Sequence, residues 1–121
     1  MKRILVVDDA KVIRMIIKQV LSNNGFEVVG EAENGREAME KYKALKPDAV
    51  TMDIIMPVMD GLQGLKEILA FDKEAKVVMI SAIDQKDSLM EAIRCGAADY
   101  VVKPFEDDRM VDALNNVLGK P

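Results

Sequence analysis

Histidine is absent from this sequence of 121 residues, and cysteine occurs once, at Cys95. Without histidine the chain cannot assemble a Ser-His-Asp or Cys-His nucleophile, and a single cysteine allows neither an internal disulfide nor a typical zinc site. The surrounding sequence AIRCGAA indicates that Cys95 is a small buried helix residue rather than a reactive thiol. Any chemistry must therefore depend on carboxylates, hydroxyls and lysines.

A net positive charge and long apolar runs are also absent. The formal net charge is −4, so no broad basic field exists to attract nucleic-acid phosphates or an anionic membrane surface. The apolar run ILVV near the N-terminus has only four residues before two aspartates, which is too short for a signal-peptide core or a membrane span. We therefore expect a cytoplasmic protein with no direct nucleic-acid partner and no membrane insertion.

The sequence contains no linker-like or low-complexity segment. A chain of 121 residues has the length of one domain and can bury roughly two-thirds of its unfolded surface without metal or disulfide. Half of the residues are hydrophobic and 31% are charged, which is typical of a globular domain. We expect a single domain spanning residues 1–121.

Two kinds of sequence pattern alternate along the chain. Short runs rich in β-branched residues predict five strands, at 3–7, 27–32, 48–52, 76–80 and 99–102. A segment with apolar residues at helical spacing follows each run, and Gly25 and Pro47 mark the ends of the first two. The apolar stripe of the first segment consists of Val12, Ile13, Ile16, Ile17, Val20 and Leu21. The alternation predicts an α/β fold, a doubly wound (βα)5 arrangement with a five-stranded parallel sheet and right-handed crossovers.

Polar side chains gather where the predicted strands end. Asp8 and Asp9 follow the first strand, Asp53 the third, Ser81 the fourth and Lys103 the fifth, and ligands of such sheets bind at this edge. Each residue also has a local alternative: a helix cap, a turn aspartate or a solvated lysine. Those local roles leave unexplained why three acids share one edge, because their repulsion raises carboxylate pKa values unless a cation is present.

The three acids favour a particular ligand class. Clustered carboxylates without histidine or cysteine suit a hard divalent cation, above all Mg²⁺, which also binds phosphate oxygens. Lys103 would add a second positive charge and Ser81 a neutral donor, so the set predicts a phosphoryl site. Asp53 lies alone opposite the Asp8 and Asp9 pair and is the best placed carboxylate to act as a nucleophile.

Four motifs in this order and spacing resemble those of response-regulator receiver domains, of the stand-alone CheY-like type. They are LVVDD (5–9), MDIIMPVMDG (52–61), SA (81–82) and GAADYVVKPF (96–105). The resemblance covers essentially the whole chain. It implies a flavodoxin-like, CheY-like sheet of order 2-1-3-4-5 and a role in two-component signal transduction, with chemotaxis as one candidate pathway.

The resemblance also implies roles for individual residues. Asp53 would accept a phosphoryl group from a phosphohistidine of a partner kinase, assisted by Lys103 and Ser81, and the lack of histidine in this chain fits an external donor. Asp9, Asp53 and the backbone carbonyl of Ile55 would bind Mg²⁺ directly. Asp8 would act mostly through water. Such a domain accepts a phosphoryl group and can lose it, but it is not a turnover enzyme.

A switch and an output face are implied in the same way. Ser81 and Tyr100 would form the switch pair, in which the hydroxyl moves to the phosphoryl oxygen and the ring turns inward. Pro104 would follow a cis peptide bond, and Asp60 would cap the third helix. The signal would leave through the fourth helix, fifth strand and fifth helix of a monomer, toward a flagellar motor switch, a kinase or a phosphorelay protein.

The sequence departs from some receivers at two positions beside the site. Ile55 follows Asp53 by two residues and Ile83 follows Ser81 by two, and both are apolar where other receivers often carry polar groups. An apolar side chain cannot orient a hydrolytic water. The departure bears on how long the phosphoryl group persists.

Two other classes of protein remain as alternatives to the receiver. A small phosphotransferase or phosphatase with an aspartate nucleophile, of the haloacid dehalogenase class, would need a general acid at position 55, and Ile55 cannot serve. A nucleotide- or flavin-binding domain would need a glycine-rich or hydroxyl-rich loop after the first strand, where this chain has DDAKVIR. Both are weaker interpretations than the receiver.

Overall fold

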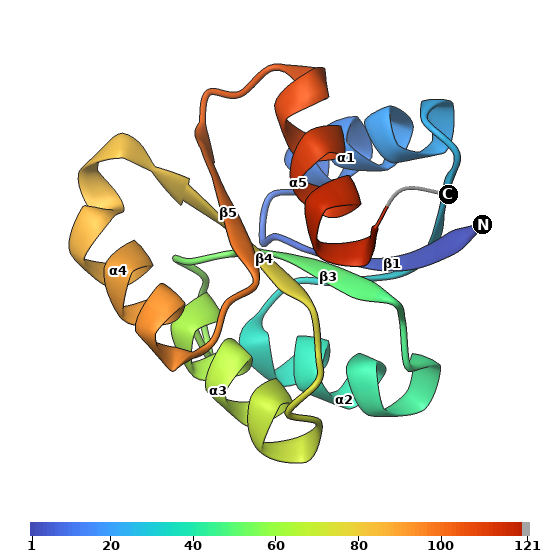
Figure 1. Ribbon diagram of the computed structural model, residues 1–121. Coiled ribbons are helices and arrows are strands. Elements are labelled where there is room, and N and C mark those ends of the chain that lie inside the picture. Colours follow the sequence, from blue (N-terminus) through green and yellow to red (C-terminus); the bar gives the residue numbers. More distant parts are fainter. Residues whose placement is uncertain (120–121) are drawn as a thin grey trace.

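A computed structural model describes residues 1–119 and shows a five-stranded parallel sheet of order β2-β1-β3-β4-β5 with five α-helices (Figure 1). The elements are β1 Lys2–Val7, α1 Lys11–Asn23, β2 Phe26–Ala32, α2 Gly35–Leu45, β3 Ala49–Asp53, α3 Gly61–Phe71, β4 Val77–Ala82, a 3-10 turn Ile83–Gln85, α4 Lys86–Cys95, β5 Asp99–Lys103 and α5 Asp107–Leu118. The predicted fold class and strand order are confirmed. Lys120 and Pro121, at the end of the expected domain, lie outside the described residues.

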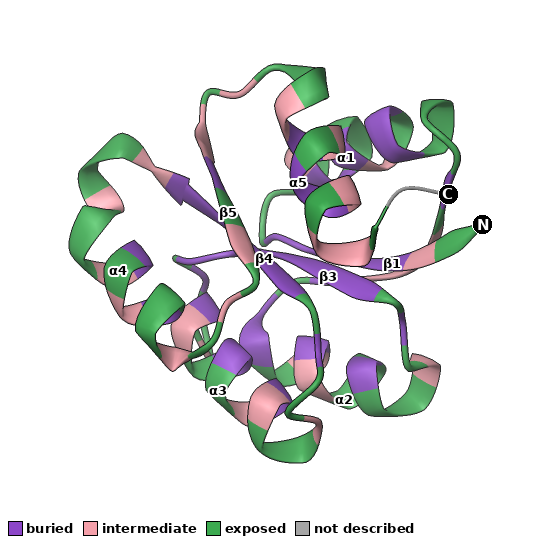
Figure 2. Cartoon of the chain, in the orientation of Figure 1, coloured by how far each residue is buried: buried purple, intermediate pink, exposed green. Residues whose placement is uncertain are grey.

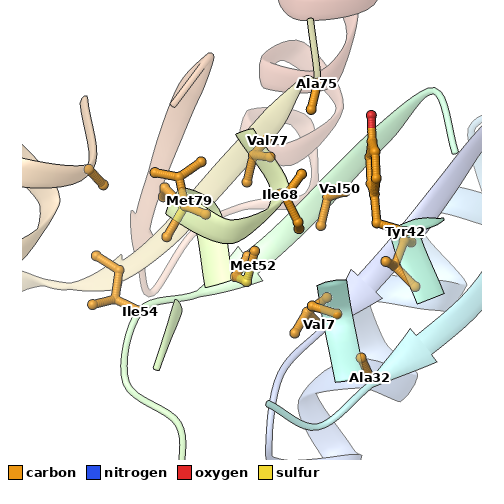
Figure 3. Close-up of a cluster of buried hydrophobic side chains, with 14 of the residues drawn as sticks. Val7, Ala32, Tyr42, Val50, Met52, Ile54, Ile68, Ala75, Val77 and Met79 are labelled. Carbon is orange, nitrogen blue, oxygen red and sulfur yellow. The ribbon is translucent and has the colours of Figure 1, made fainter. Parts of the chain in front are cut away.

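The sheet is covered on both sides, as the apolar strands require (Figure 1). One cluster of buried side chains lies between the sheet and α2, α3 and α4, and Figure 3 shows part of it, from Val7 on β1 to Met79 on β4. A second cluster lies between the other side of the sheet and α1 and α5. In Figure 2 the central strands are accordingly buried, whereas the outward faces of the helices are exposed.

Successive strand residues contribute to opposite clusters, because side chains alternate along a strand. On β3, for example, Val50 and Met52 belong to the cluster under α2, α3 and α4, while Ala49 belongs to the cluster under α1 and α5. We refer to these two sides of the sheet as the α1/α5 side and the α2/α3/α4 side. This alternation decides on which side each site residue lies.

Local chemistry determines where several helices begin and end. Asp60 caps α3 as expected, since its side chain accepts a hydrogen bond of 2.9 Å from the Gln63 N–H. The Asn34 side chain caps α2 in the same way. Lys46, which precedes Pro47, ends α2 in a left-handed conformation with φ of 47°. The cis bond expected between Lys103 and Pro104 is present.

The structure refines two expectations. Cys95 is only partly buried at the end of α4, packed beside the α2/α3/α4 cluster, because the last turn of the helix lies at the rim of that cluster. Within α1, Val12 and Ile16 are exposed while Arg14 is buried. Across residues 1–119 no helix has both the length and the apolar character needed to cross a membrane.

Candidate functional site

The predicted site residues divide between the two sides of the sheet. Asp53 shares its side with Ala49 and Thr51 on β3, and Lys103 shares its side with Val101 on β5, so both belong to the α1/α5 side. Ser81 pairs with Val102, which packs against the α2/α3/α4 cluster. The charged groups and the hydroxyl therefore reach the same edge from opposite sides.

Asp8, Asp9 and Asp53 come together as the sequence predicts. One carboxylate oxygen from each lies within 4.8 Å of the other two. Asp8 and Asp53 are buried, at 1% and 6% exposure, whereas Asp9 is exposed. Three acids so close together create a negative cluster with one open side.

Lys103 supplies the countercharge. Its Nζ lies 3.3 Å from Asp53 Oδ1 and 3.7 Å from Asp8 Oδ2. One cation cannot neutralise three carboxylates. Burial and the nearby Asp8 carboxylate raise the pKa of Asp53 to about 6, against the opposing effect of Lys103. Burial also raises the pKa of Asp8, although the Ala10 N–H, which donates to it, opposes the increase.

Two buried oxygens at this edge have no hydrogen-bond partner among the described residues: Asp8 Oδ2 and Ser81 Oγ. Buried polar atoms are rarely left without a partner, because desolvation without a hydrogen bond costs about 1–3 kcal/mol. Ser81 is 1% exposed. The two oxygens fit a site that binds a further cation and a further oxygen-rich group.

Local hydrogen bonds account for only part of this geometry. Ala10 is the N-cap of α1 and receives no side-chain cap, and Asp8 Oδ1 instead accepts from the Ala10 N–H at 2.9 Å. Gln85 precedes α4 and its side chain accepts from the Ala82 N–H. Ser81 therefore caps no helix. Lys103 makes ion pairs rather than extending into solvent.

The loop between β3 and α3 folds back over the nucleophile candidate. Gly61 makes this possible, since a Cβ on it would lie 2.0 Å from the carbonyl oxygen of Asp53. Val58 has a φ of 67°, and the Met59 N–H donates to the Pro57 carbonyl in a tight turn. The side chain of Ile55 in this loop is 54% exposed, and that of Ile83 after β4 is 75% exposed.

The predicted switch residues lie on one side of the sheet. Tyr100 and Val102 share the α2/α3/α4 side of β5, and Val102 is the register partner of Ser81. A cavity of about 190 Å³, lined by Ser81, Ile83, Leu89 and Val102 among others, lies beneath α4. The Tyr100 ring is 39% exposed and lies outside this cavity, with the Arg109 guanidinium 5.9 Å from the ring centroid.

Sequence reasoning missed Arg14 and the close approach at Gly61. Arg14 is 7% exposed and donates to the backbone carbonyl of Asp8 at 2.6 Å. Its one signal in the sequence is a basic residue between Ile13 and Ile17 of an otherwise apolar helical stripe. Nothing in the sequence indicates the close approach at Gly61, because the path of the backbone is needed to see what its missing Cβ would meet.

Comparison with known proteins identifies the class that this fold and site define. The profile of the response regulator receiver domain matches residues 4–115. The chain belongs to this family. Receiver domains of this kind accept a phosphoryl group and are not turnover enzymes, and the three acids form a cluster typical of an Mg²⁺ site.

Two of the similar proteins are CheY proteins, and the similarity extends over almost their whole length. The chain is 54% identical to the chemotaxis protein CheY of Thermotoga maritima, over 96% of this chain and 97% of the relative. It is 55% identical to CheY of Bacillus subtilis, over 97% and 98%. A crystal structure of a CheX-CheY-BeF3-Mg²⁺ complex from Borrelia burgdorferi has a TM-score of 0.92 at 35% identity, covering 98% of this chain and 90% of that one.

Proposed function

We propose that the chain acts as a single receiver unit in chemotaxis signalling, in which transfer of a phosphoryl group to Asp53 controls binding to a target protein. The observation that supports this most strongly is the buried Asp53 carboxylate, 3.3 Å from Lys103 and beside two further acids. The high identity to CheY proteins along almost the whole chain supports the pathway.

Asp53 would be the attacking group. An oxygen of its carboxylate forms the new bond to phosphorus as the phosphorus–nitrogen bond of a phosphohistidine breaks, and the leaving imidazole keeps the electron pair. Attack requires the ionised carboxylate. Because burial raises the pKa of Asp53 to about 6, a nearby cation increases the ionised fraction at neutral pH.

Asp8, Asp9 and Asp53, with the backbone carbonyl of Ile55, would hold Mg²⁺. The ion supplies positive charge to the transferring phosphoryl oxygens when bound. Asp9 is the exposed member and can turn toward a ligand, whereas Asp8 is held by the hydrogen bond from the Ala10 N–H. Asp9 and Asp53 are therefore proposed as direct ligands, and Asp8 as one that acts through water.

Ser81 and Tyr100 would convert the modification into a change of surface. A phosphoryl oxygen on Asp53 gives Ser81 Oγ the partner that it lacks, and movement of Ser81 opens the cavity beneath α4 to the Tyr100 ring. The exposed ring lies on the surface formed by α4, β5 and α5. The target would recognise this surface with the ring turned inward.

The partners are proposed by class. A histidine kinase in the cytoplasm would donate the phosphoryl group, and the target would be a flagellar motor switch or phosphorelay protein bound by the monomer. The chain is similar to the CheY of a complex that also contains CheX, beryllofluoride and Mg²⁺. A protein that binds in the presence of beryllofluoride and Mg²⁺, as CheX does in that complex, is therefore a third class of partner.

The test is modification by a small phosphodonor. With Mg²⁺ and acetyl phosphate, intact-mass analysis is expected to show one added phosphoryl group on the parent and none on Asp53→Asn. Asp60→Asn is the matched control, because it changes an acid in the same loop and keeps a residue that can cap α3. Equal labelling of Asp53→Asn and the parent would contradict the assignment.

A further inference from the structure

Arg14 is the only basic side chain that is buried in the part of the chain that the structure describes. It lies on α1, on the face toward the sheet, with 8% of its side chain exposed. Burying a guanidinium is costly unless its donors are satisfied. Its contacts therefore show what the buried charge does.

The guanidinium joins the loop that carries the acids to the end of a neighbouring strand. Arg14 Nη1 donates to the carbonyl oxygen of Asp8 at 2.6 Å, and Nε donates to Glu31 Oε1 at 3.0 Å. Glu31 lies on β2, and Lys18 donates to its other carboxylate oxygen at 2.8 Å. A second acid, Glu33, is 3.7 Å from Nη2.

Three of the four polar atoms of Asp8 are held by hydrogen bonds. Its N–H donates to the Ala32 carbonyl at 3.0 Å, its carbonyl accepts from Arg14, and its Oδ1 accepts from the Ala10 N–H. The remaining oxygen, Oδ2, faces Lys103 and has no hydrogen bond among the described residues. The hydrogen bonds thus leave one atom of Asp8 available to the acidic site.

The contribution of Arg14 is mainly positional. Arg14 and Lys18 carry two positive charges, and Glu31 and Glu33 carry two negative charges in the same group of ion pairs. Burial raises the pKa of Asp8, and the charge of Arg14 opposes this increase, but less than the Ala10 N–H and Lys103 do. What Arg14 supplies is a fixed carbonyl and hence a fixed turn from β1 into α1.

We propose that Arg14 is a positioning residue of the Mg²⁺ site, which orients Asp8 and the adjacent Asp9 by binding the Asp8 carbonyl and anchoring it to Glu31 of β2. The inference rests on the proposed metal site and assigns part of its affinity to a side chain that never touches the metal. Groups that orient metal ligands in this way typically contribute roughly tenfold or more to metal affinity.

The experiment compares two double variants of equal charge. Arg14→Met with Glu31→Gln removes the link to Asp8 and also the half-buried carboxylate that Arg14 pairs with. Lys18→Met with Glu31→Gln removes the same acid and one positive charge but keeps both anchors of Arg14, because its guanidinium can still donate to the Asp8 carbonyl and to the amide oxygen that Glu31→Gln provides. Calorimetric titration with Mg²⁺ gives the affinity, urea unfolding gives the stability, and amide exchange of Ala10 in metal-free protein reports the turn.

The Arg14 pair is expected to bind Mg²⁺ about tenfold more weakly than the parent and to exchange the Ala10 amide faster, while the Lys18 pair stays within about twofold of the parent. If both pairs lose stability but bind Mg²⁺ like the parent, Arg14 is only structural and the inference is wrong. Arg14→Lys, which keeps the charge, provides the same comparison should the first pair fail to fold. A parent that binds no Mg²⁺ would instead overturn the metal site itself, and the inference with it.

Discussion

Asp53 combines two properties that conflict in a metal-free protein. It is almost fully buried, and it shares its edge of the sheet with Asp8 and Asp9. Lys103 is the one basic side chain within ion-pair distance of it among residues 1–119. A buried carboxylate under these conditions holds its proton more tightly than an unfolded chain does.

The pH dependence of stability follows from the direction of this shift. The pKa of Asp53 rises from 3.8 to about 6, so its contribution to folding is fully present below pH 4 and is lost as the pH rises through about 6. The loss is at most about 3 kcal/mol, at 1.36 kcal/mol for each pKa unit. Urea unfolding with EDTA between pH 4 and pH 8 is expected to show this decrease for the parent relative to Asp53→Asn.

Other carboxylates also titrate in this range, so only the difference between the parent and Asp53→Asn is diagnostic. Burial raises the pKa of Asp8 as well, whereas the hydrogen bond from Lys18 lowers the pKa of Glu31. Saturating Mg²⁺ should abolish the pH dependence of this stability difference, because the ion favours the ionised form of Asp53. A difference that is independent of pH would show that Asp53 titrates normally.

Ile55 and Ile83 bear on the lifetime of the phosphoryl group. Both side chains are exposed beside the site, and neither can orient a water in line with the oxygen–phosphorus bond. Ile55→Asn, alone and with Ile83→Glu, is expected to accelerate autodephosphorylation by about tenfold, which needs only about 1.4 kcal/mol of barrier. The measurement is loss of phosphoryl label at saturating Mg²⁺.

The control for that experiment is Val58→Asn. It places the same polar side chain in the same exposed loop, at a left-handed position that asparagine tolerates. Its hydrolysis rate should match that of the parent. Rates within about twofold for all variants would mean that these isoleucines do not set the lifetime.

At the scale of single elements, β3 contains a buried polar side chain that no hydrogen bond stabilises. Thr51 is fully buried on the α1/α5 side, and its Oγ1 has no hydrogen-bond partner among the described residues. Thr51→Val keeps the shape and removes the hydroxyl, so we expect a gain of about 1 kcal/mol in the free energy of unfolding. Urea unfolding is the measurement, and Thr51→Ser, which keeps the hydroxyl, should not be stabilised.

The contact between α5 and β5 bears on the proposed switch. Arg109 lies over the exposed Tyr100 ring, donates to its backbone carbonyl and pairs with Asp99. Only the contact with the ring depends on the ring pointing outward. An exposed cation–π contact is worth about 0.5–1 kcal/mol, so Arg109→Met should shift Tyr100 inward and increase beryllofluoride affinity about two- to fivefold.

Tyrosine content makes this shift measurable. The chain has two tyrosines and no tryptophan, so incorporation of fluorotyrosine gives two ¹⁹F signals. The Tyr42 hydroxyl donates to Asp72 at 2.8 Å in a buried position and serves as the reference. Arg94→Met, which removes an exposed arginine of α4, is the control. An unchanged Tyr100 signal in Arg109→Met would contradict the proposed bias.

Most elements could be predicted from the sequence, whereas α1 shows where that reasoning stops. The periodicity counted Val12 and Ile16 with the apolar stripe, yet both are exposed and Arg14 is buried between them. Hydropathy describes each residue alone, but the position of Arg14 depends on Glu31 from another strand. The edge that gathers the acids was predictable from strand order, while the contacts behind Asp8 required the packed helix.

At the scale of the whole molecule, Lys103 connects the charged side of the sheet edge to the strand that carries Tyr100. Lys103→Ala should still accept beryllofluoride at Asp53, but the Tyr100 ¹⁹F signal should no longer respond to it, because the charge-assisted contact that reports the phosphoryl group is gone. Lys11→Ala, an exposed lysine at the start of α1, is the control. A full response in Lys103→Ala would make Lys103 a solvated loop cation.

The separation of the acidic edge of the sheet from the outward surface of α4, β5 and α5 matters for duplicated genes. Substitutions on that surface can change the recognised target while Asp8, Asp53 and Lys103, at the edge where the strands end, keep the capacity to accept a phosphoryl group. Two gene copies could thus acquire different outputs while sharing one input. They would then compete for the same phosphoryl donor, so that the abundance of one copy would set the sensitivity of the other.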